Sequence, residues 1–264
     1  MPTEFLNGIN IYYQRTGTGP RLLYVNGSGA TLALVGPMLG VFTNDFDVLA
    51  HDQRGLGLTS IPVGPYEMAD YAADAAALAA SIGWDTYNVF GVSFGGMVAQ
   101  ELAVTFPSRI ERLVLACTSS GGAGGSSYPL HQLVDTPDEQ RHTTQRSIMD
   151  NRFTDEWLAE HESDRFLAEA LGAQRAVEKT AEVERGERLQ LDARSRHDVF
   201  DRLTRIACPT LVASGRFDGI APPANGEAIA TQIPNADFQL YDGGHAFFFQ
   251  DASAFPNIKA FLLS

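Results

Sequence analysis

The pattern of hydrophobic and polar positions changes twice along the chain and divides it into three parts. The first part begins with short apolar runs separated by turn residues such as Asn7-Gly8, and continues with longer apolar runs that alternate with helix-period segments. The short β-type runs predict strands, and the longer ones suit a sheet that is buried on both faces. Predicted strands are 9–14, 22–25, 46–50, 87–92 and 110–116, and predicted helices are 70–82 and 97–106.

The second part follows a stretch at 119–127 that consists almost entirely of glycine and serine. From about 137 to 203 the sequence is charged and helix-periodic, as in 154–160, and it contains no convincing strand. This texture predicts an inserted helical lid. We interpret 119–127 as a flexible loop rather than a phosphate cradle, because no clear helix start follows it.

Strand-type runs return in the third part, at 210–214 and 238–241, with helices predicted at 221–233 and 252–263. A β/α alternation interrupted by one helical block predicts an α/β fold with a doubly wound, mostly parallel sheet. Ligand sites in such sheets lie at the carboxyl ends of the strands. The predicted division is a first core segment at 1–120, the lid at 121–203 and a second core segment at 204–264.

Composition narrows the classes of protein to which this chain could belong. Its 264 residues, 44% of them hydrophobic, can bury one large core. A formal net charge of -13 without a Lys/Arg cluster argues against nucleic acid and anionic membranes as partners. The start, Met1 to Glu4, lacks the features of a signal peptide, and no apolar run has membrane length, so we expect a cytoplasmic protein. Cys117 and Cys208 are interpreted as core residues, and no metal site is expected.

The segment Gly91-Val92-Ser93-Phe94-Gly95-Gly96 lies between a strand-like run and a helix-like run. A serine at a sharp strand-to-helix turn can project its hydroxyl toward a substrate, and the flanking glycines remove side chains that would collide with neighbouring backbone. The following helix directs its N-terminal amides at developing negative charge. A plain flexible loop is the alternative, but the flanking strand and helix favour Ser93 as a nucleophile.

A serine nucleophile needs a base and an acid that orients the base. His245 follows the last strand and can reach the carboxyl edge of the sheet, whereas His51 lies in an early turn. Asp218 follows the strand 210–214, and Asp242 is the competing acid, interpreted as a cap of its own loop. The other histidines fall in the polar insertion, where solvated side chains are expected: His131, His142, His161 and His197.

The order Ser93, Asp218, His245, together with the elbow, resembles the α/β-hydrolase fold family along nearly the whole chain. Segment 21–29 is similar to the strand and oxyanion loop of that family, and 51–60 to its Asp-x-Arg-Gly-x-Gly turn, whose Arg54 we interpret as structural. The resemblance implies an eight-stranded sheet and an oxyanion hole formed by the amides of Ser28 and Phe94. It departs at Asn26-Gly27, where the family usually has His-Gly. Some members place the acid after the strand that precedes the lid, but 116–120 contains no carboxylate.

A serine at the elbow suits acyl transfer, whereas family members that act on haloalkanes or epoxides carry an aspartate there. The chain looks most like small esterases and lactonases, such as 3-oxoadipate enol-lactonases and cofactor-free haloperoxidase-type enzymes. We therefore expect a cofactor-free serine hydrolase of a small carboxylic ester or lactone. Two alternatives stay open: a carbon-carbon bond hydrolase of a ring-cleavage product, and a small-ligand signalling receptor.

The residues that select the substrate are harder to predict. The lid aromatics Phe153, Trp157 and Phe166 could line an apolar pocket or pack the lid onto the sheet, and we favour packing. The oligomeric state stays open, a homo-oligomer included. The candidate pocket residues are Gly29, Trp157, Ile220 and Phe247.

Overall fold

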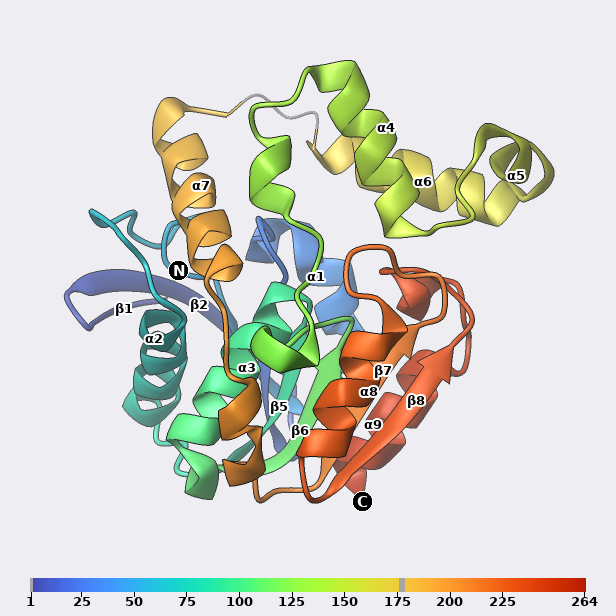
Figure 1. Cartoon of the computed structure of the whole chain (residues 1–264). Coiled ribbons are helices and arrows are strands. Elements are labelled where there is room, and N and C mark those ends of the chain that lie inside the picture. Colours follow the sequence, from blue (N-terminus) through green and yellow to red (C-terminus); the bar gives the residue numbers. More distant parts are fainter. Residues whose placement is uncertain (1, 176–178) are drawn as a thin grey trace.

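The centre of the molecule is an eight-stranded sheet in the order β1-β2-β4-β3-β5-β6-β7-β8 (Figure 1). This computed structural model describes residues 2–175 and 179–264. Both pairings of β2, with β1 and with β4, are antiparallel, and every pairing from β4 to β8 is parallel. The strands are β1 (Thr3–Leu6), β2 (Ile9–Thr16), β3 (Arg21–Val25), β4 (Asp47–His51), β5 (Tyr87–Val92), β6 (Ile110–Ala116), β7 (Thr210–Gly215) and β8 (Ala236–Tyr241).

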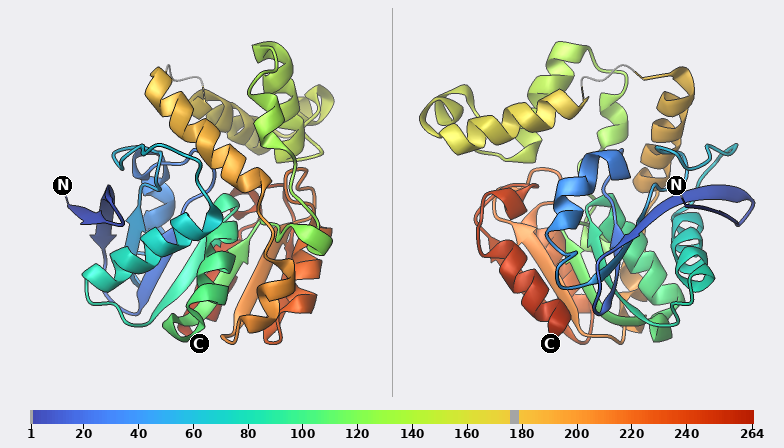
Figure 2. Two further views of the ribbon diagram at one scale, coloured as in Figure 1. Left: turned by 60° about the vertical axis from the view of Figure 1, so that its left-hand side comes forward. Right: turned by 180° about the vertical axis from the view of Figure 1, so that it is seen from behind.

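Helices cover both faces of the sheet (Figure 2). The central strands are buried on both sides because alternate side chains enter opposite cores: Val89 of β5 joins one cluster and Phe90 the other. The first cluster packs under α2, α3 and α8, and the second under α1 and α9. These helices are α1 (Leu32–Gly40), α2 (Met68–Ser81), α3 (Phe94–Thr105), α8 (Pro223–Gln232) and α9 (Ala254–Leu263).

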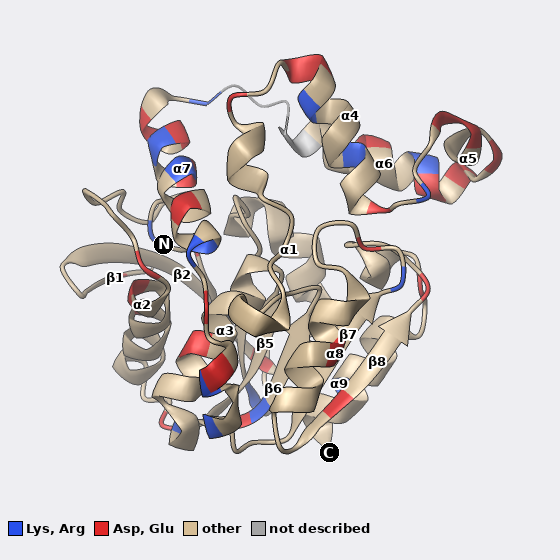
Figure 3. Cartoon of the chain, viewed as in Figure 1, with Lys and Arg blue, Asp and Glu red and all other residues tan. Residues whose placement is uncertain are grey.

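In the described part of the chain four α-helices lie between β6 and β7, where the sequence predicts the lid, and Figure 1 shows them above the carboxyl edge of the parallel strands. Thr154 and Thr180 cap two of them, each accepting a hydrogen bond from a backbone amide of the first turn. Charged residues of both signs occur along these helices, whereas the parallel strands contain few (Figure 3). The lid helices are α4 (Asp138–Met149), α5 (Asp155–Glu160), α6 (Glu162–Arg175) and α7 (Ala181–Ser195).

Short 3-10 turns connect several of these elements. In the early Asp-x-Arg-Gly turn, the guanidinium of Arg54 makes two hydrogen bonds to the Asp74 carboxylate, at 2.7 and 2.9 Å. That pairing agrees with a structural role for Arg54. The 3-10 turns are η1 (Pro107–Arg109), η2 (Gly122–Gly124), η3 (Leu130–Leu133), η4 (Phe200–Arg205) and η5 (Phe247–Phe249).

The predicted fold class is confirmed, and the bounds of β5 and β6 match the predicted ones. Outside the lid, one strand and one α-helix escaped prediction: β1, a four-residue edge strand, and α1, which contains Pro37 and two glycines. Helix α3 begins at Phe94, three residues before the predicted start at Met97. The prediction placed the start too late because Gly95 and Gly96, in the first turn, are poor helix formers. The stretch 119–127 is a packed loop with one 3-10 turn, and Ser119 and Ser120 are fully buried.

No helix in the described part of the chain has both the length and the apolar composition needed to cross a membrane.

Candidate active site

Ser93 sits on the turn between β5 and α3, where the chain reverses within one residue. Its backbone has φ 57° and ψ -116°, a strained conformation for a residue with a side chain. The turn is possible because the neighbouring positions are glycines: a Cβ on Gly95 would lie 2.0 Å from the Val25 carbonyl oxygen, and one on Gly91 would lie 2.5 Å from the Gly95 oxygen. The packing around the turn therefore holds the Ser93 hydroxyl away from the backbone.

A continuous line of hydrogen bonds joins Ser93, His245 and Asp218. Nε2 of His245 lies 2.9 Å from Oγ of Ser93, and Nδ1 lies 2.7 Å from Oδ2 of Asp218. The other carboxylate oxygen of Asp218 accepts hydrogen bonds from the backbone amides of Ile220 and Ala221, at 2.8 and 2.9 Å. Since the carboxylate is buried and held by two amides, its second oxygen can orient the imidazole with Nδ1 protonated and Nε2 free to accept a proton.

The two partners of Ser93 come from loops at the carboxyl ends of β7 and β8, as the parallel topology requires. Their loops are packed together: a Cβ on Gly215 would meet the carbonyl oxygen of Gly244 at 2.0 Å. His245 is further tied to the lid, because its amide donates to the carbonyl oxygen of Met149 at 2.6 Å. Asp242, the competing acid, points to solvent with 74% of its side chain exposed and pairs with Arg152.

The loop after β3 lies against the turn that carries Ser93. A Cβ on Gly27 would be 3.6 Å from Cβ of Ser93, so the amide of Ser28 belongs to a segment in contact with the elbow. The next amide, of Gly29, donates to Oε1 of Gln190 at 2.8 Å, and Gln190 is a fully buried residue of lid helix α7. The lid thus fixes one end of this loop.

Asn26, at the position where the resemblance led us to expect histidine, has a buried side chain that secures the other end of the same loop. The side-chain Nδ2 of Asn26 donates to the backbone carbonyl oxygen of His51 at 3.4 Å, and the backbone carbonyl oxygen of Asn26 accepts from Nε2 of Gln53 at 2.8 Å. The backbone of the loop is therefore held from both sides without a histidine. Phe94, the second residue with a predicted oxyanion amide, is the first residue of α3, whose opening amides have no acceptor within the helix.

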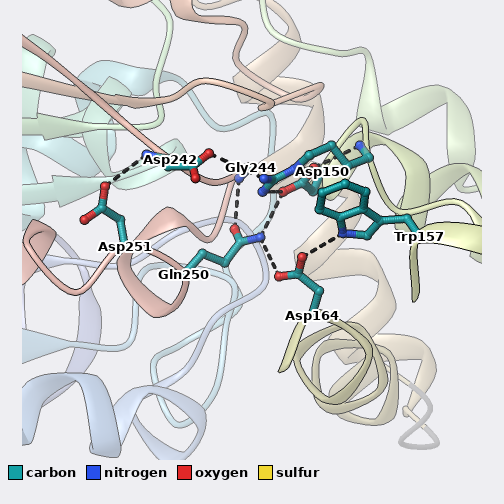
Figure 4. Close-up of polar contacts among 8 residues, drawn as sticks. Asp150, Trp157, Asp164, Asp242, Gly244, Gln250 and Asp251 are labelled. Carbon is teal, nitrogen blue, oxygen red and sulfur yellow. Dashed lines mark hydrogen bonds and ion pairs between the residues drawn. The ribbon is translucent and has the colours of Figure 1, made fainter. Parts of the chain in front are cut away.

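A second polar network connects the lid to the loop that carries His245 (Figure 4). At its centre Gln250 accepts from the amide of Gly244 at 2.9 Å and donates to Asp150 and Asp164 at 2.9 and 3.0 Å. Asp150 is buried and also pairs with Arg152, whose guanidinium lies 3.9 Å from the centroid of the Phe217 ring. The network therefore links α5, α6 and the two loops that supply Asp218 and His245.

The predicted pocket residues fall in different surroundings. Ile220 is buried in a small apolar cluster with Met149 of the lid, next to Asp218, and Gly29 has open space where a side chain would extend. Phe247, in contrast, is fully buried and stacks on Tyr241 at 4.9 Å, so it packs in the core and has no surface for a substrate. Trp157 stacks on His161 at 3.6 Å and donates to Asp164, which places it in the lid network.

The other lid aromatics also behave differently from each other. Phe153 is buried with 3% exposure, which agrees with a packing role, whereas Phe166 is 72% exposed and packs nothing onto the sheet.

The expectation that His197 is solvated is wrong, because it lies 7% exposed beneath the lid. Burial lowers its pKa to about 4, with only partial compensation from the charge of Glu101. His51 is likewise buried at the end of β4, and burial lowers its pKa to about 4. Both imidazoles are therefore neutral at pH 7, and their environments suit structural roles rather than proton transfer.

These two histidines make the stability of the fold depend on pH. Because their folded pKa values lie below the ordinary 6.5, the unfolded chain binds more protons between pH 6.5 and pH 4. We expect each to lower the free energy of unfolding by roughly 1 kcal/mol per pH unit as the pH falls through that range. Urea unfolding of wild type and His197→Gln at several pH values measures this, and the variant should show the shallower dependence. An equal slope in both proteins, or a change in the exposed His142→Gln control, would contradict the assignment.

The site also contains residues that sequence reasoning missed, chiefly Gln190 and Gln250. Each is an amide side chain whose partners lie far away in the chain: Gln190 bonds to Gly29 and Gln250 to Asp150. No sequence pattern around a glutamine in a helix or turn predicts a hydrogen bond to a residue far away in the chain. Only the general expectation that lid residues approach the carboxyl edge could have suggested them.

With this geometry in view, comparison with known proteins defines the class. The model of the alpha/beta hydrolase fold family matches residues 20–252, so the chain belongs to that family. Among curated relatives, it is 32% identical to the poly(3-hydroxyalkanoate) depolymerase of Ectopseudomonas oleovorans over 91% of this chain and 83% of that protein. It is also 27% identical to 3-oxoadipate enol-lactonase 2 of Acinetobacter baylyi, over 86% and 82% of the two chains.

Solved structures show the same fold. The crystal structure of the enol-lactonase of Burkholderia xenovorans LB400 superimposes with a TM-score of 0.83 over 100% of both chains, at 22% sequence identity. At that level of identity the likeness establishes the fold and leaves the substrate to other arguments.

Proposed function

We propose that this protein is a serine hydrolase that cleaves a small carboxylic ester or lactone through an acyl-enzyme intermediate. The observation that carries the proposal is the hydrogen-bonded line from Ser93 Oγ through His245 to Asp218, with distances of 2.9 and 2.7 Å. Relatives named for poly(3-hydroxyalkanoate) and for an enol-lactone support an acyl C–O bond as the one that breaks. No cofactor is needed for this chemistry.

In the first half of the proposed cycle, Oγ of Ser93 attacks the carbonyl carbon while Nε2 of His245 accepts the hydroxyl proton. The tetrahedral oxyanion receives hydrogen bonds from the amides of Phe94 and Ser28. When the intermediate collapses, the bond to the alcohol oxygen breaks and His245 returns the proton to that oxygen. A lactone opens in the same way, with its alcohol still attached to the acyl group.

In the second half, water attacks the acyl-serine ester, and His245 accepts a proton from the water. The second tetrahedral intermediate collapses to a carboxylic acid, and the proton passes to Ser93 Oγ. The net reaction consumes one water and yields one acid and one alcohol, so atoms and charge balance. Asp218 stabilises the imidazolium in both halves through its short hydrogen bond to Nδ1.

The neighbouring nucleophile, Cys117, fits this chemistry poorly. It lies at the end of β6 and is buried, with a backbone φ of 43°. Burial, together with the charge of Asp218, raises the pKa of its thiol well above the ordinary value, so it stays protonated and weakly nucleophilic. Ser93 therefore has the only hydroxyl or thiol with a hydrogen bond to His245 among the described residues.

A fluorophosphonate probe tests the proposal directly, because it reacts with an activated serine and leaves unactivated hydroxyls alone. We expect mass spectrometry to find a single adduct on the peptide that contains Ser93. Pretreatment with heat should abolish labelling, since the adduct depends on the folded site. Labelling at another serine, or turnover of a vinylogous diketone without turnover of any ester or lactone, would overturn the proposal.

A further inference from the structure

A small cavity of about 100 Å³ lies between α3, the carboxyl end of α7 and the segment that follows β6. Four buried polar atoms of its lining residues have no hydrogen-bond partner among the described residues: Nδ1 of His131, Nε of Arg194, and both ring nitrogens of His197. The residues that line the cavity include Met97, Ser126, Ser127, His131, Arg194 and His197.

Arg194 is the charged member of this wall. The residue is 5% exposed; Nη1 donates to the carbonyl oxygen of Tyr128 at 2.8 Å, while Nε is buried without an acceptor. Within residues 2–175 and 179–264 no carboxylate forms an ion pair with it. Burial lowers its pKa to about 10, so the guanidinium is still charged at neutral pH. The charge of the Asp218 carboxylate offsets part of this shift without forming an ion pair, so the guanidinium has no counter-ion in contact with it. A buried charge without such a contact is costly, which indicates that an anion completes the site.

The rest of the wall supplies donors without adding charge. His197 is neutral at pH 7, and neither ring nitrogen has a partner; Nδ1 of His131 is also buried and unpartnered. Ser126 and Ser127 are further polar residues of the wall. One positive charge surrounded by neutral donors matches a monoanion better than a dianionic phosphate, and a guanidinium can hold a carboxylate through two parallel hydrogen bonds.

Two helices place this cavity next to the reacting centre. Met97 follows Ser93 by four residues at the start of α3, and its amide donates to the Ser93 carbonyl oxygen. Arg194 follows Gln190 by four residues on α7, and Gln190 bonds to Gly29 beside the proposed oxyanion amide of Ser28. Residues four apart lie on the same face of a helix, about 6 Å apart along its axis. The first turn of α3 and the last turns of α7 thus each run from the proposed reacting centre to the wall of the cavity.

We propose that Arg194 binds a carboxylate on the substrate, so that the preferred esters or lactones carry a free acid group a short chain away from the scissile carbonyl. This inference rests on the proposed hydrolase function and adds the substrate class. Nε2 of Gln190 is also buried and lacks a hydrogen-bond acceptor in the described part of the chain. It could donate to an oxygen in the part of the substrate that connects the carboxylate to the scissile carbonyl. An acidic protein of net charge -13 repels anions in general, so a local cation is the feature that would admit this one.

The kinetic test uses two esters that differ only at the distal end: p-nitrophenyl hydrogen glutarate and p-nitrophenyl methyl glutarate. We expect wild type to prefer the free acid in kcat/KM by about tenfold to a hundredfold, the range expected for a hydrogen bond to a charged group. Arg194→Met should abolish the preference, mainly through KM for the acid. Arg194→Lys, which keeps the charge, should retain part of it.

Arg196→Gln is the matched control, because Arg196 lies two residues further on, is 45% exposed and pairs with Glu67. It should leave the preference unchanged. Equal kcat/KM for the two esters in wild type, or an unchanged preference in Arg194→Met, would overturn the inference.

A binding measurement keeps the inference separate from the proposed function. Glutarate, titrated calorimetrically into wild type, should bind, whereas the uncharged glutaramide should not, and Arg194→Met should lose the glutarate signal. Hydrolysis of neutral esters without glutarate binding would refute the carboxylate site and leave the hydrolase intact. Absence of hydrolysis and of Ser93 labelling would refute the hydrolase, and with it the substrate class. If Arg194→Met shows no unfolding transition, its loss of glutarate binding reflects loss of structure. Arg194→Lys then provides the test, and the inference requires that this variant binds glutarate.

Discussion

Replacing Ser93 with alanine is expected to lower kcat for ester hydrolysis by about 10⁵-fold or more, because the three hydrogen-bonded groups act as one unit. The residual rate should resemble that of a site with an oxyanion pocket but no nucleophile. Since the Ser93 side chain caps nothing in α3 and bonds to His245, its removal costs the fold little. The thermal midpoint should therefore stay close to that of wild type.

The measurement is a steady-state assay with a chromogenic ester, beside a denaturation curve for each protein. Ser147→Ala provides the matched control, because Ser147 is an exposed serine of α4 whose hydroxyl bonds to the Thr144 carbonyl oxygen. It should retain wild-type kcat. A Ser93→Ala protein that keeps more than about a tenth of the activity would show that the reaction uses another nucleophile, since a triad knockout costs several orders of magnitude.

The parts of the fold that were predictable from sequence are those with a strong local signal. Strands β5 and β6 are mostly apolar runs bounded by turn residues, so their ends were predicted to the residue. Strand β1 has no such signal, because it is short, lies at the sheet edge and exposes Phe5. The start of α3 was misplaced because Gly95 and Gly96 look like loop residues, although the absence of their side chains is what lets the helix approach β3 and Thr118.

The candidate site shows the same division between local and distant information. Ser93, Asp218 and His245 each follow a strand of a parallel sheet, so the topology alone predicts that they meet at one edge. The aromatic residues near the site were less predictable: Trp157 and Phe247 have the size of pocket residues, but their partners Asp164 and Tyr241 decide where they pack. Likewise, nothing near Arg194 in the sequence indicates that its charge is buried without a counter-ion.

Replacing Asp218 with asparagine is expected to lower kcat by about 10⁴-fold through the wrong histidine tautomer rather than through loss of structure. The amides of Ile220 and Ala221 both donate to Oδ1, so they fix the oxygen of the new carboxamide at that position. Its NH₂ group must then face Nδ1 of His245 and donate to it. Nδ1 becomes the acceptor, and the ring carries its proton on Nε2, where it faces Ser93 and cannot remove the hydroxyl proton.

The matched control is Asp242→Asn, which removes the same charge three residues before His245. Since the Asp242 side chain is exposed and only pairs with Arg152 at 3.4 Å, this variant should keep wild-type kcat. Steady-state assays of both variants, with denaturation curves to verify folding, distinguish the two acids. A large loss of kcat in Asp242→Asn with little effect in Asp218→Asn would show that Asp242, and not Asp218, is the acid. Both substitutions remove one negative charge from a loop that lies beside or carries His245. If kcat falls only in Asp218→Asn, the cause is the changed hydrogen bond to His245 and not the change in net charge.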